Sequence, residues 1–224
     1  MDVTQSVVGK PPTRRQLAAQ ETRRKLLEAA LEHFSRRPYA DVTVADIARS
    51  AGVAHGLLSH HFNGKENLYA EVVGVIDQRL RAAAKIGSDG PVIERLRRHL
   101  AAHLRFLAEN EDAALNLILR RADTTDAAWK AFETTSQEGI RAICGLLGLD
   151  ADAPALRLTM RGFSAACDET ALVWLRSGRP YEIEALVDVF VAFLTGAIRA
   201  ACDLAPTPVL REALEVLQPE VSDG

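Results

Sequence analysis

Aromatic residues and cysteines are scarce in this sequence, and both shortages limit the class of protein that it encodes. Phe, Trp and Tyr make up 5% of the 224 residues, while Ala and Leu abound, which favours helices. The cysteines are odd in number and far apart in the sequence, so they indicate no disulfide framework and fit a reducing cytoplasm. They are Cys144, Cys167 and Cys202, and a redox-sensing role for one of them stays an alternative.

The sequence also shows no stretch typical of a targeting signal or a membrane-spanning helix. The first fifteen residues, MDVTQSVVGKPPTRR, lack the apolar core of a secretory signal. The longest apolar run, residues 189–194, is far too short to cross a bilayer. We therefore expect a cytoplasmic protein with no membrane partner.

The motifs of the common enzyme classes do not occur. There is no nucleophile elbow, phosphate-binding loop or dinucleotide fingerprint. His99 and His103 lie four residues apart on a predicted helix, a spacing that would let them share a metal ion. The segment HLAAH lacks the Glu of the metalloprotease motif, and no third ligand is evident nearby. We expect no catalytic site, metal or other cofactor, and a helical enzyme that uses these two histidines is an alternative.

Charge is distributed unevenly along the chain. The net charge is −3, with 48% hydrophobic and 25% charged residues, which is ordinary for a soluble globular protein. Residues 1–85 hold 13 Lys and Arg against 9 Asp and Glu, whereas residues 86–224 hold 14 against 21. The basic N-terminal part can bind phosphate groups even though the rest of the chain, residues 86–224, is acidic.

Apolar residues recur at helical spacing through nearly the whole chain, so we predict an all-α fold. Thr13 with Gln16, and Asn63 with Glu66, fit capping boxes at the starts of two helices. The expected helices cover residues 13–37, 43–51, 54–61, 63–85, 91–108, 112–121, 125–147, 152–177, 182–202 and 207–217. The expected parts are a disordered arm (1–12), an N-terminal DNA-binding domain (13–68), a C-terminal helical-bundle ligand-binding and dimerisation domain (69–217) and a tail (218–224).

The chain is organised around residues 41–68, DVTVADIARSAGVAHGLLSHHFNGKENL. Thr43 can cap a first helix with Asp46 at its third position, and Gly52 suits the left-handed backbone that ends it. A second helix follows after three or four residues. This is the helix-turn-helix pattern, in which the second helix enters the major groove of DNA. An ordinary helical hairpin is the alternative that the spacing leaves open.

The same segment resembles the TetR family of bacterial repressors, whose pattern runs T-x-x-x-I-A-x-x-A-G-V-S-x-G-x-L-Y-x-H-F-x-x-K-E-x-L. The matching positions are Thr43, Ile47, Ala48, Ala51, Gly52, Val53, Gly56, Leu58, His61, Phe62, Lys65, Glu66 and Leu68. Two positions depart from the pattern: Ala54 stands where the family has Ser, and Ser59 where it has Tyr. Both family residues commonly contact the DNA backbone. Backbone contacts contribute to affinity more than to sequence specificity, so the two departures are expected to change the affinity for DNA more than the specificity.

The resemblance implies a three-helix DNA-binding head with its contacts at defined positions. The residues facing bases would be His55, Gly56, Leu57, Ser59 and His60. Thr43, His61 and Lys65 would lie near phosphates. One or two of the basic residues in the first half of the helix over 13–37 would also approach the DNA backbone; these are Arg14, Arg15, Arg23, Arg24 and Lys25.

The resemblance further implies an effector pocket inside the body and a homodimer formed by the last two long helices. The candidate pocket residues are Phe106, Asn116, Trp129, Phe132, Phe163 and Trp174, and core packing is the alternative for each. The scarcity of Tyr favours an apolar or amphipathic effector. We therefore predict a ligand-responsive regulator, a repressor, that binds double-stranded palindromic DNA as a homodimer. The alternative is a helical small-molecule or protein-binding module that has lost operator recognition, which Ala54 and Ser59 favour.

Overall fold

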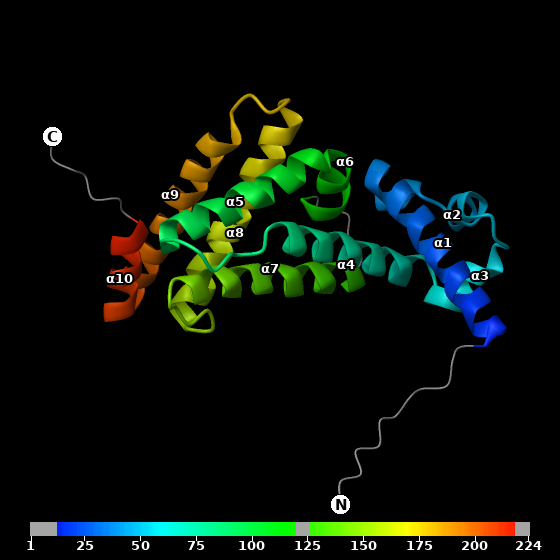
Figure 1. Ribbon diagram of the computed structural model, residues 1–224, viewed down its shortest axis with the longest axis horizontal. Coiled ribbons are helices and arrows are strands. Elements are labelled where there is room, and N and C mark those ends of the chain that lie inside the picture. Colours follow the sequence, from blue (N-terminus) through cyan, green and yellow to red (C-terminus); the bar gives the residue numbers. More distant parts are fainter. Residues whose placement is uncertain (1–12, 120–125, 218–224) are drawn as a thin grey trace, which may run out of the picture.

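The computed structural model describes residues 13–119 and 126–217, with the side chains of 126–132, 134 and 135 left out. Every regular element in these residues is helical, so the all-α prediction is confirmed (Figure 1). The elements are α1 (Arg14–Arg36), η1 (Tyr39–Asp41), α2 (Val44–Ala51), α3 (Gly56–Phe62), α4 (Lys65–Ala83), α5 (Val92–Glu109), α6 (Glu111–Ala113), η2 (Ala114–Ile118), α7 (Asp126–Leu146), α8 (Pro154–Arg176), α9 (Ile183–Leu204) and α10 (Pro208–Leu217).

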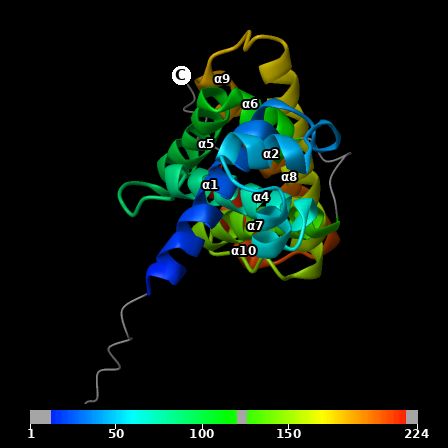
Figure 2. The same cartoon turned by 90° about the vertical axis from the view of Figure 1, so that its right-hand side faces the viewer.

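Helices α1 to α3 form a head at one end of the molecule, and α4 leads from the head into the body (Figures 1 and 2). The capping box of Thr13 and Gln16 starts α1 as predicted. Its inner stripe is buried in a core with residues of α2, α3 and α4. The largest fully buried side chains of this core are Leu26, Phe34, Ile47, Leu58 and Leu68.

The turn between α2 and α3 has the geometry that the sequence predicted. Gly52 has φ +65°, and the N–H of Val53 donates to the carbonyl of Ala48 at 3.0 Å. This pairing closes the end of α2 because the left-handed residue turns the chain back on the last helical turn. The second helix was expected over 54–61 and is observed as Gly56–Phe62. Its first turn is tighter, since the N–H of Leu57 donates to the carbonyl of Ala54, three residues back.

The prediction that Asn63 caps α4 is wrong. Asn63 has φ +57° and ends α3, with its N–H donating to the carbonyl of Ser59 at 2.9 Å. Gly64, at φ +117°, then occupies the position before α4 and has no side chain to cap it. Asn tolerates the left-handed region better than most residues, so here it serves the end of one helix instead of the start of the next.

The body packs α5 and α7 to α10 around a second, larger core. Helix α7 runs along α4, and α8 and α9 form an antiparallel pair joined by a short turn (Figure 1). Pro154 stands in the first turn of α8, and Gly148 and Gly178 take left-handed backbones after α7 and α8. Among the described residues, α9 is the one helix long and apolar enough to cross a membrane, with mean hydropathy 1.8. Its buried residues belong to the body core, and core helices pass the same test.

The segment between α5 and α7 contributes to both cores. Ala113 and Leu117 belong to the head core, whereas Ala114 and Leu119 belong to the body core. The expected helix over 112–121 is instead the short α6 followed by the π-helical turn η2. Asn116 in η2 donates from Nδ2 to the carbonyl of Ser35 in α1 at 2.8 Å. The head and body are therefore joined through α6 and η2 as well as through α4.

We expect Leu117→Ala to lower the free energy of unfolding by about 2–4 kcal/mol, because it removes a buried leucine from the head core. Urea unfolding followed by circular dichroism would measure the change. Leu115→Ala is the matched control, since Leu115 lies in the same turn and is only partly buried against the body core. An equal loss in both variants would contradict a special role for Leu117.

Candidate nucleic-acid interface

Helix α3 buries one face and exposes the other. Leu58 and Phe62 lie in the head core. The side chains predicted to meet bases are exposed at His55, Ser59 and His60, as is Gly56, whereas Leu57 is half-buried. The helix therefore presents a mainly polar surface that is held from beneath by apolar contacts.

His61 sits at the border between these two faces. Its ring lies edge-on to that of His60, with 5.2 Å between centroids. Burial lowers the pKa of His61, and the neighbouring His60 and Arg23 lower it further. The imidazole is therefore neutral at pH 7, where one ring nitrogen donates a hydrogen bond and the other accepts one.

Thr43 starts α2 through a complete capping box. Its hydroxyl accepts from the N–H of Asp46 at 3.1 Å and donates to Asp46 Oδ2 at 2.8 Å. The hydrogen bonds that Asp46 Oδ2 accepts from the Thr43 hydroxyl and from the Thr43 backbone N–H are the main cause that lowers the pKa of Asp46, and Arg37 and Arg49 add to it. The carboxylate at the N-terminus of α2 is thereby kept charged, which suits the positive end of the helix dipole.

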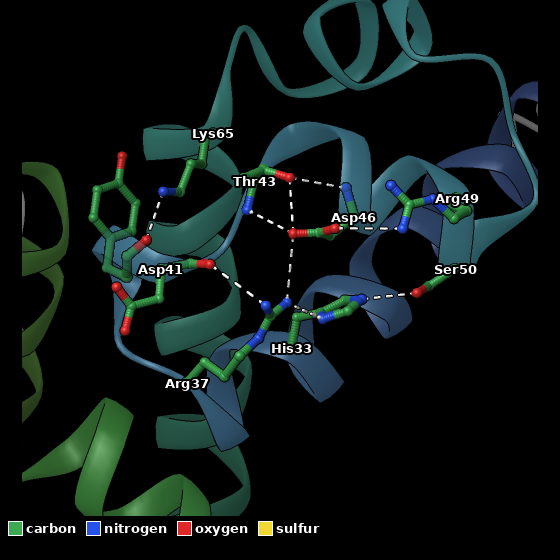
Figure 3. A network of polar contacts seen from close by, with 9 residues as sticks. His33, Arg37, Asp41, Thr43, Asp46, Arg49, Ser50 and Lys65 are labelled. Carbon is green, nitrogen blue, oxygen red and sulfur yellow. Dashed lines mark hydrogen bonds and ion pairs between the residues drawn. The ribbon is translucent and has the colours of Figure 1, made fainter.

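Arg37 joins three elements of the head (Figure 3). Its Nη2 donates to His33 Nδ1 at 2.7 Å and lies 3.7 Å from Asp46 Oδ2, and its Nη1 donates to the carbonyl of Asp41 at 3.4 Å. His33 Nε2 in turn lies 2.7 Å from Ser50 Oγ. One side chain thus ties the end of α1 to η1 and to the start of α2. Sequence reasoning missed Arg37, and its one local signal was a basic residue directly before the helix-ending Pro38.

Lys65, predicted to lie near a phosphate, makes two contacts with Tyr39. Its Nζ donates to the Tyr39 carbonyl at 2.5 Å and lies 3.9 Å from the centre of the Tyr39 ring. Desolvation lowers the pKa of Lys65, and the nearby Asp41 opposes that shift. An ammonium group has three donors, so this contact leaves donors for a second acceptor.

Most of the basic residues in α1 are engaged within the protein. Arg23 pairs with Glu71 of α4 and stacks 4.7 Å from the centre of the Phe62 ring. Arg24 and Lys25 pair with acidic residues of α1 itself. Arg14 and Arg15 are exposed and have no ion pair among the described residues, so they are the α1 cations best placed to meet an external anion.

The four predicted pocket residues whose side chains the structure describes do not line a common cavity. Phe106, Phe163 and Trp174 are buried, and Trp174 Nε1 donates to the carbonyl of Tyr181 at 2.8 Å. Asn116 lies at the junction of head and body. The side chains of Trp129 and Phe132 fall outside the described residues. A groove of about 850 Å³ between α7 and α8 and a cleft of about 470 Å³ between head and body are lined by other residues.

His99 and His103 lie on α5 and are partly buried. His99 donates from Nδ1 to the carbonyl of Ala84. Burial lowers the pKa of both rings, that of His103 to about 4, so both are neutral at pH 7. Across residues 13–119 and 126–217, no group of three His, Cys, Asp or Glu side chains could hold a metal ion.

Comparisons with known proteins agree with this geometry. The family model described as "Bacterial regulatory proteins, tetR family" matches residues 26–72, which run from the middle of α1 to the middle of α4. The transcriptional activator FasR of Mycolicibacterium smegmatis is 29% identical over 189 residues, covering 81% of this chain and 85% of that protein. A tetR-family regulator from Streptomyces coelicolor superimposes with a TM-score of 0.71 at 26% identity, covering 90% of this chain and 91% of that one. Residues 26–72 thus form a DNA-binding domain of the TetR family.

A more distant TetR-like neighbour shares the fold. The regulator FadR from Bacillus subtilis, solved in complex with stearoyl-CoA, has a TM-score of 0.57 and 21% identity, covering 76% of this chain and 96% of that one. Members of the TetR family are helix-turn-helix transcriptional regulators that bind DNA, and they are not enzymes in general. In helix-turn-helix proteins the second helix of the motif lies in the major groove, and α3 holds that position in this chain.

We expect Arg37→Ala to weaken DNA binding by roughly tenfold, about 1.4 kcal/mol, without changing its salt dependence. Arg37 holds α2 against α1 and does not itself need to contact a phosphate. Fluorescence anisotropy over a salt series would measure both quantities. Arg36→Ala is the control, because among the described residues Arg36 pairs with Glu32 on its own helix and with no residue of α2. A salt slope reduced by about one in Arg37→Ala would mean that Arg37 contacts a phosphate directly.

Proposed function

We propose that this TetR protein is a cytoplasmic, ligand-responsive transcriptional repressor that binds a palindromic operator as a homodimer. The observation that carries the proposal is the exposed, mainly polar face of α3, held by the buried Leu58 and Phe62. The base contacts would come from His55, Gly56, Leu57, Ser59 and His60. Thr43, His61 and Lys65 would contact phosphates, which set the register of the head on the duplex.

The homodimer is supported by the surface of the last two long helices. Leu158 and Val173 on α8 and Val189 on α9 are large apolar side chains that stay exposed in the single chain. A twofold pair would cover them and present two recognition helices to two half-sites. Half-sites about one helical turn apart, roughly 34–36 Å, follow from such an arrangement.

Effector control is supported by the α6–η2 segment, whose residues pack in both the head core and the body core. Any ligand that changes the packing of α5 to α8 acts on the segment that places Ala113 and Leu117 in the head core. A coupling of about 1–3 kcal/mol is sufficient for a 5- to 150-fold change in DNA affinity. The neighbour FadR was solved with stearoyl-CoA, which favours an apolar or amphipathic effector here, in keeping with the scarcity of Tyr. Phe106, Phe163 and Trp174 are the described residues that we propose lie nearest to it.

Activation is the second candidate mode of regulation. It is favoured by one observation, namely that FasR is described as an activator and spans most of this chain. The two modes differ in where the operator lies relative to the promoter, and the same DNA-binding face serves both.

Selection of bound fragments from random or genomic DNA, at a stated salt concentration, tests the proposed function. We expect enrichment of a palindrome with two half-sites, because a twofold dimer presents two identical recognition helices. A folded, dimeric protein that enriches no sequence would contradict operator recognition and favour a helical binding module. In that outcome, the substitutions Ala54→Ser and Ser59→Tyr would restore the family pattern at the two positions that depart from it.

We further expect Lys65→Ala to weaken binding evenly across DNA sequences and to reduce the salt slope by about one, because one phosphate contact would be lost. Lys85→Ala, an exposed lysine beyond the far end of α4, is the matched control and should leave the slope unchanged. If Lys65→Ala lowers affinity at an unchanged slope, then Lys65 acts only by holding Tyr39.

A further inference from the structure

A cleft of about 470 Å³ lies where the end of α1 meets α6, and α4 and the end of α5 supply its other walls (Figure 1). Its apolar lining includes Leu31, Ile76 and Ala113, which belong to the head core or pack against it, and Ala108, which packs against the body core. Small-molecule sites are usually clefts of about 300–1,000 Å³ with apolar walls and a few polar groups, and they are frequent between domains. The cleft has the size and the position of such a site.

Charged groups of both signs surround this apolar lining. Arg79 of α4, Glu109 at the end of α5 and Asp112 of α6 line the cleft and are exposed. None of these three residues has an ion pair with any side chain that the structure describes. Opposite charges therefore share one cleft without neutralising each other, and both signs are available to a ligand.

The third carboxylate of the cleft, that of Glu111, is engaged from the body side. Arg179, in the turn between α8 and α9, has its Nε 3.7 Å from Glu111 Oε2. Its Nη1 donates to the carbonyl of Ala108 at 3.4 Å. Arg179 therefore braces the wall formed by the end of α5 and the start of α6, and it leaves Glu109 and Asp112 as the carboxylates that a ligand could meet.

The opposite side of the same wall is tied to the head. Asn116 donates from Nδ2 to the carbonyl of Ser35 at 2.8 Å and to the carbonyl of Asp112 at 3.0 Å. One amide group thus connects α6 with the last turn of α1 at the edge of the cleft. Walls that are held in place before binding reduce the entropy lost when a ligand is ordered between them.

We propose that this cleft binds a small zwitterion with an apolar group, of the kind and size of an apolar α-amino acid. Its carboxylate would meet the guanidinium of Arg79, which can donate two parallel hydrogen bonds to a carboxylate. Its ammonium group would meet Glu109 and Asp112, since three N–H donors can serve two acceptors. Its apolar group would cover the lining residues Leu31 and Ile76.

The two charges of the ligand are required by the two signs on the protein. A ligand with one charge would cover either Arg79 or the two carboxylates without replacing the water that solvates them, which costs free energy. The site is separate from the effector region proposed around Phe106, Phe163 and Trp174, because none of these residues lines it. A ligand in it would contact the head and the body at once.

Isothermal titration calorimetry of the full chain with L-leucine, L-methionine and L-phenylalanine tests the proposal. We expect at least one of the three to bind. The amine and the carboxylic acid that match the tightest binder, phenethylamine and 3-phenylpropionate in the case of phenylalanine, should each bind about tenfold more weakly, because each lacks one charge-assisted contact.

Substitutions that remove one charge with little change in shape locate the ligand. Arg79→Gln, Glu109→Gln and Asp112→Asn should each weaken binding of the amino acid by about tenfold, because each leaves one ligand charge without its partner. Arg211→Gln and Glu215→Gln make the same charge changes at exposed positions of α10 and should leave the affinity unchanged. Circular dichroism of each variant checks that the fold is kept.

Three outcomes would overturn the site. The matched amine or acid could bind as tightly as the amino acid, the affinity could be unchanged in all three cleft variants, or none of the three amino acids could bind. Selection of operator DNA by the ligand-free protein does not depend on this cleft, so each of these outcomes leaves the proposed function standing. A protein that binds the amino acid in the cleft and enriches no DNA sequence would have the reverse meaning.

Discussion

The exposed helix α3 depends on a small apolar core beneath it. Leu58 and Phe62 are buried there against α1 and α4. Phe34 packs edge-on against Tyr69, with 4.9 Å between ring centroids, and Tyr39 lies 4.8 Å from Tyr69. A seven-residue helix is too short to be stable alone in water, so the polar face of α3 exists because its other face is buried.

Polar side-chain contacts also hold the helices of the head together. Arg37 connects the end of α1 to the start of α2, and Lys65 connects α4 to η1 (Figure 3). Each of these two side chains joins elements that bury only a few residues in the head core. The core alone would therefore hold these elements less firmly. The helix-turn-helix is thus held as a unit before it meets DNA, which lowers the entropic cost of ordering it at the interface.

The α6–η2 segment packs against both the head and the body. Its consecutive buried residues alternate between the two cores, and Asn116 caps the end of α1 from outside the head. π-helical turns are less favourable than α-helical ones and are often kept at functional sites. In this protein the turn allows neighbouring residues to face different cores.

The sequence by itself determined the features that depend on residues a few positions apart. The capping boxes of Thr13 and Thr43, the left-handed Gly52 and the apolar periods of the long helices follow from local sterics and hydrogen bonds. Only the tertiary structure decided the contacts between distant segments, because the side chains concerned have several possible partners in the unfolded chain. Lys65 contacts the ring and the carbonyl of Tyr39. Asn63 ends α3 instead of starting α4, and Leu117 of η2 is buried in the head core. These placements are set by which helices pack together, and that is a property of the whole fold.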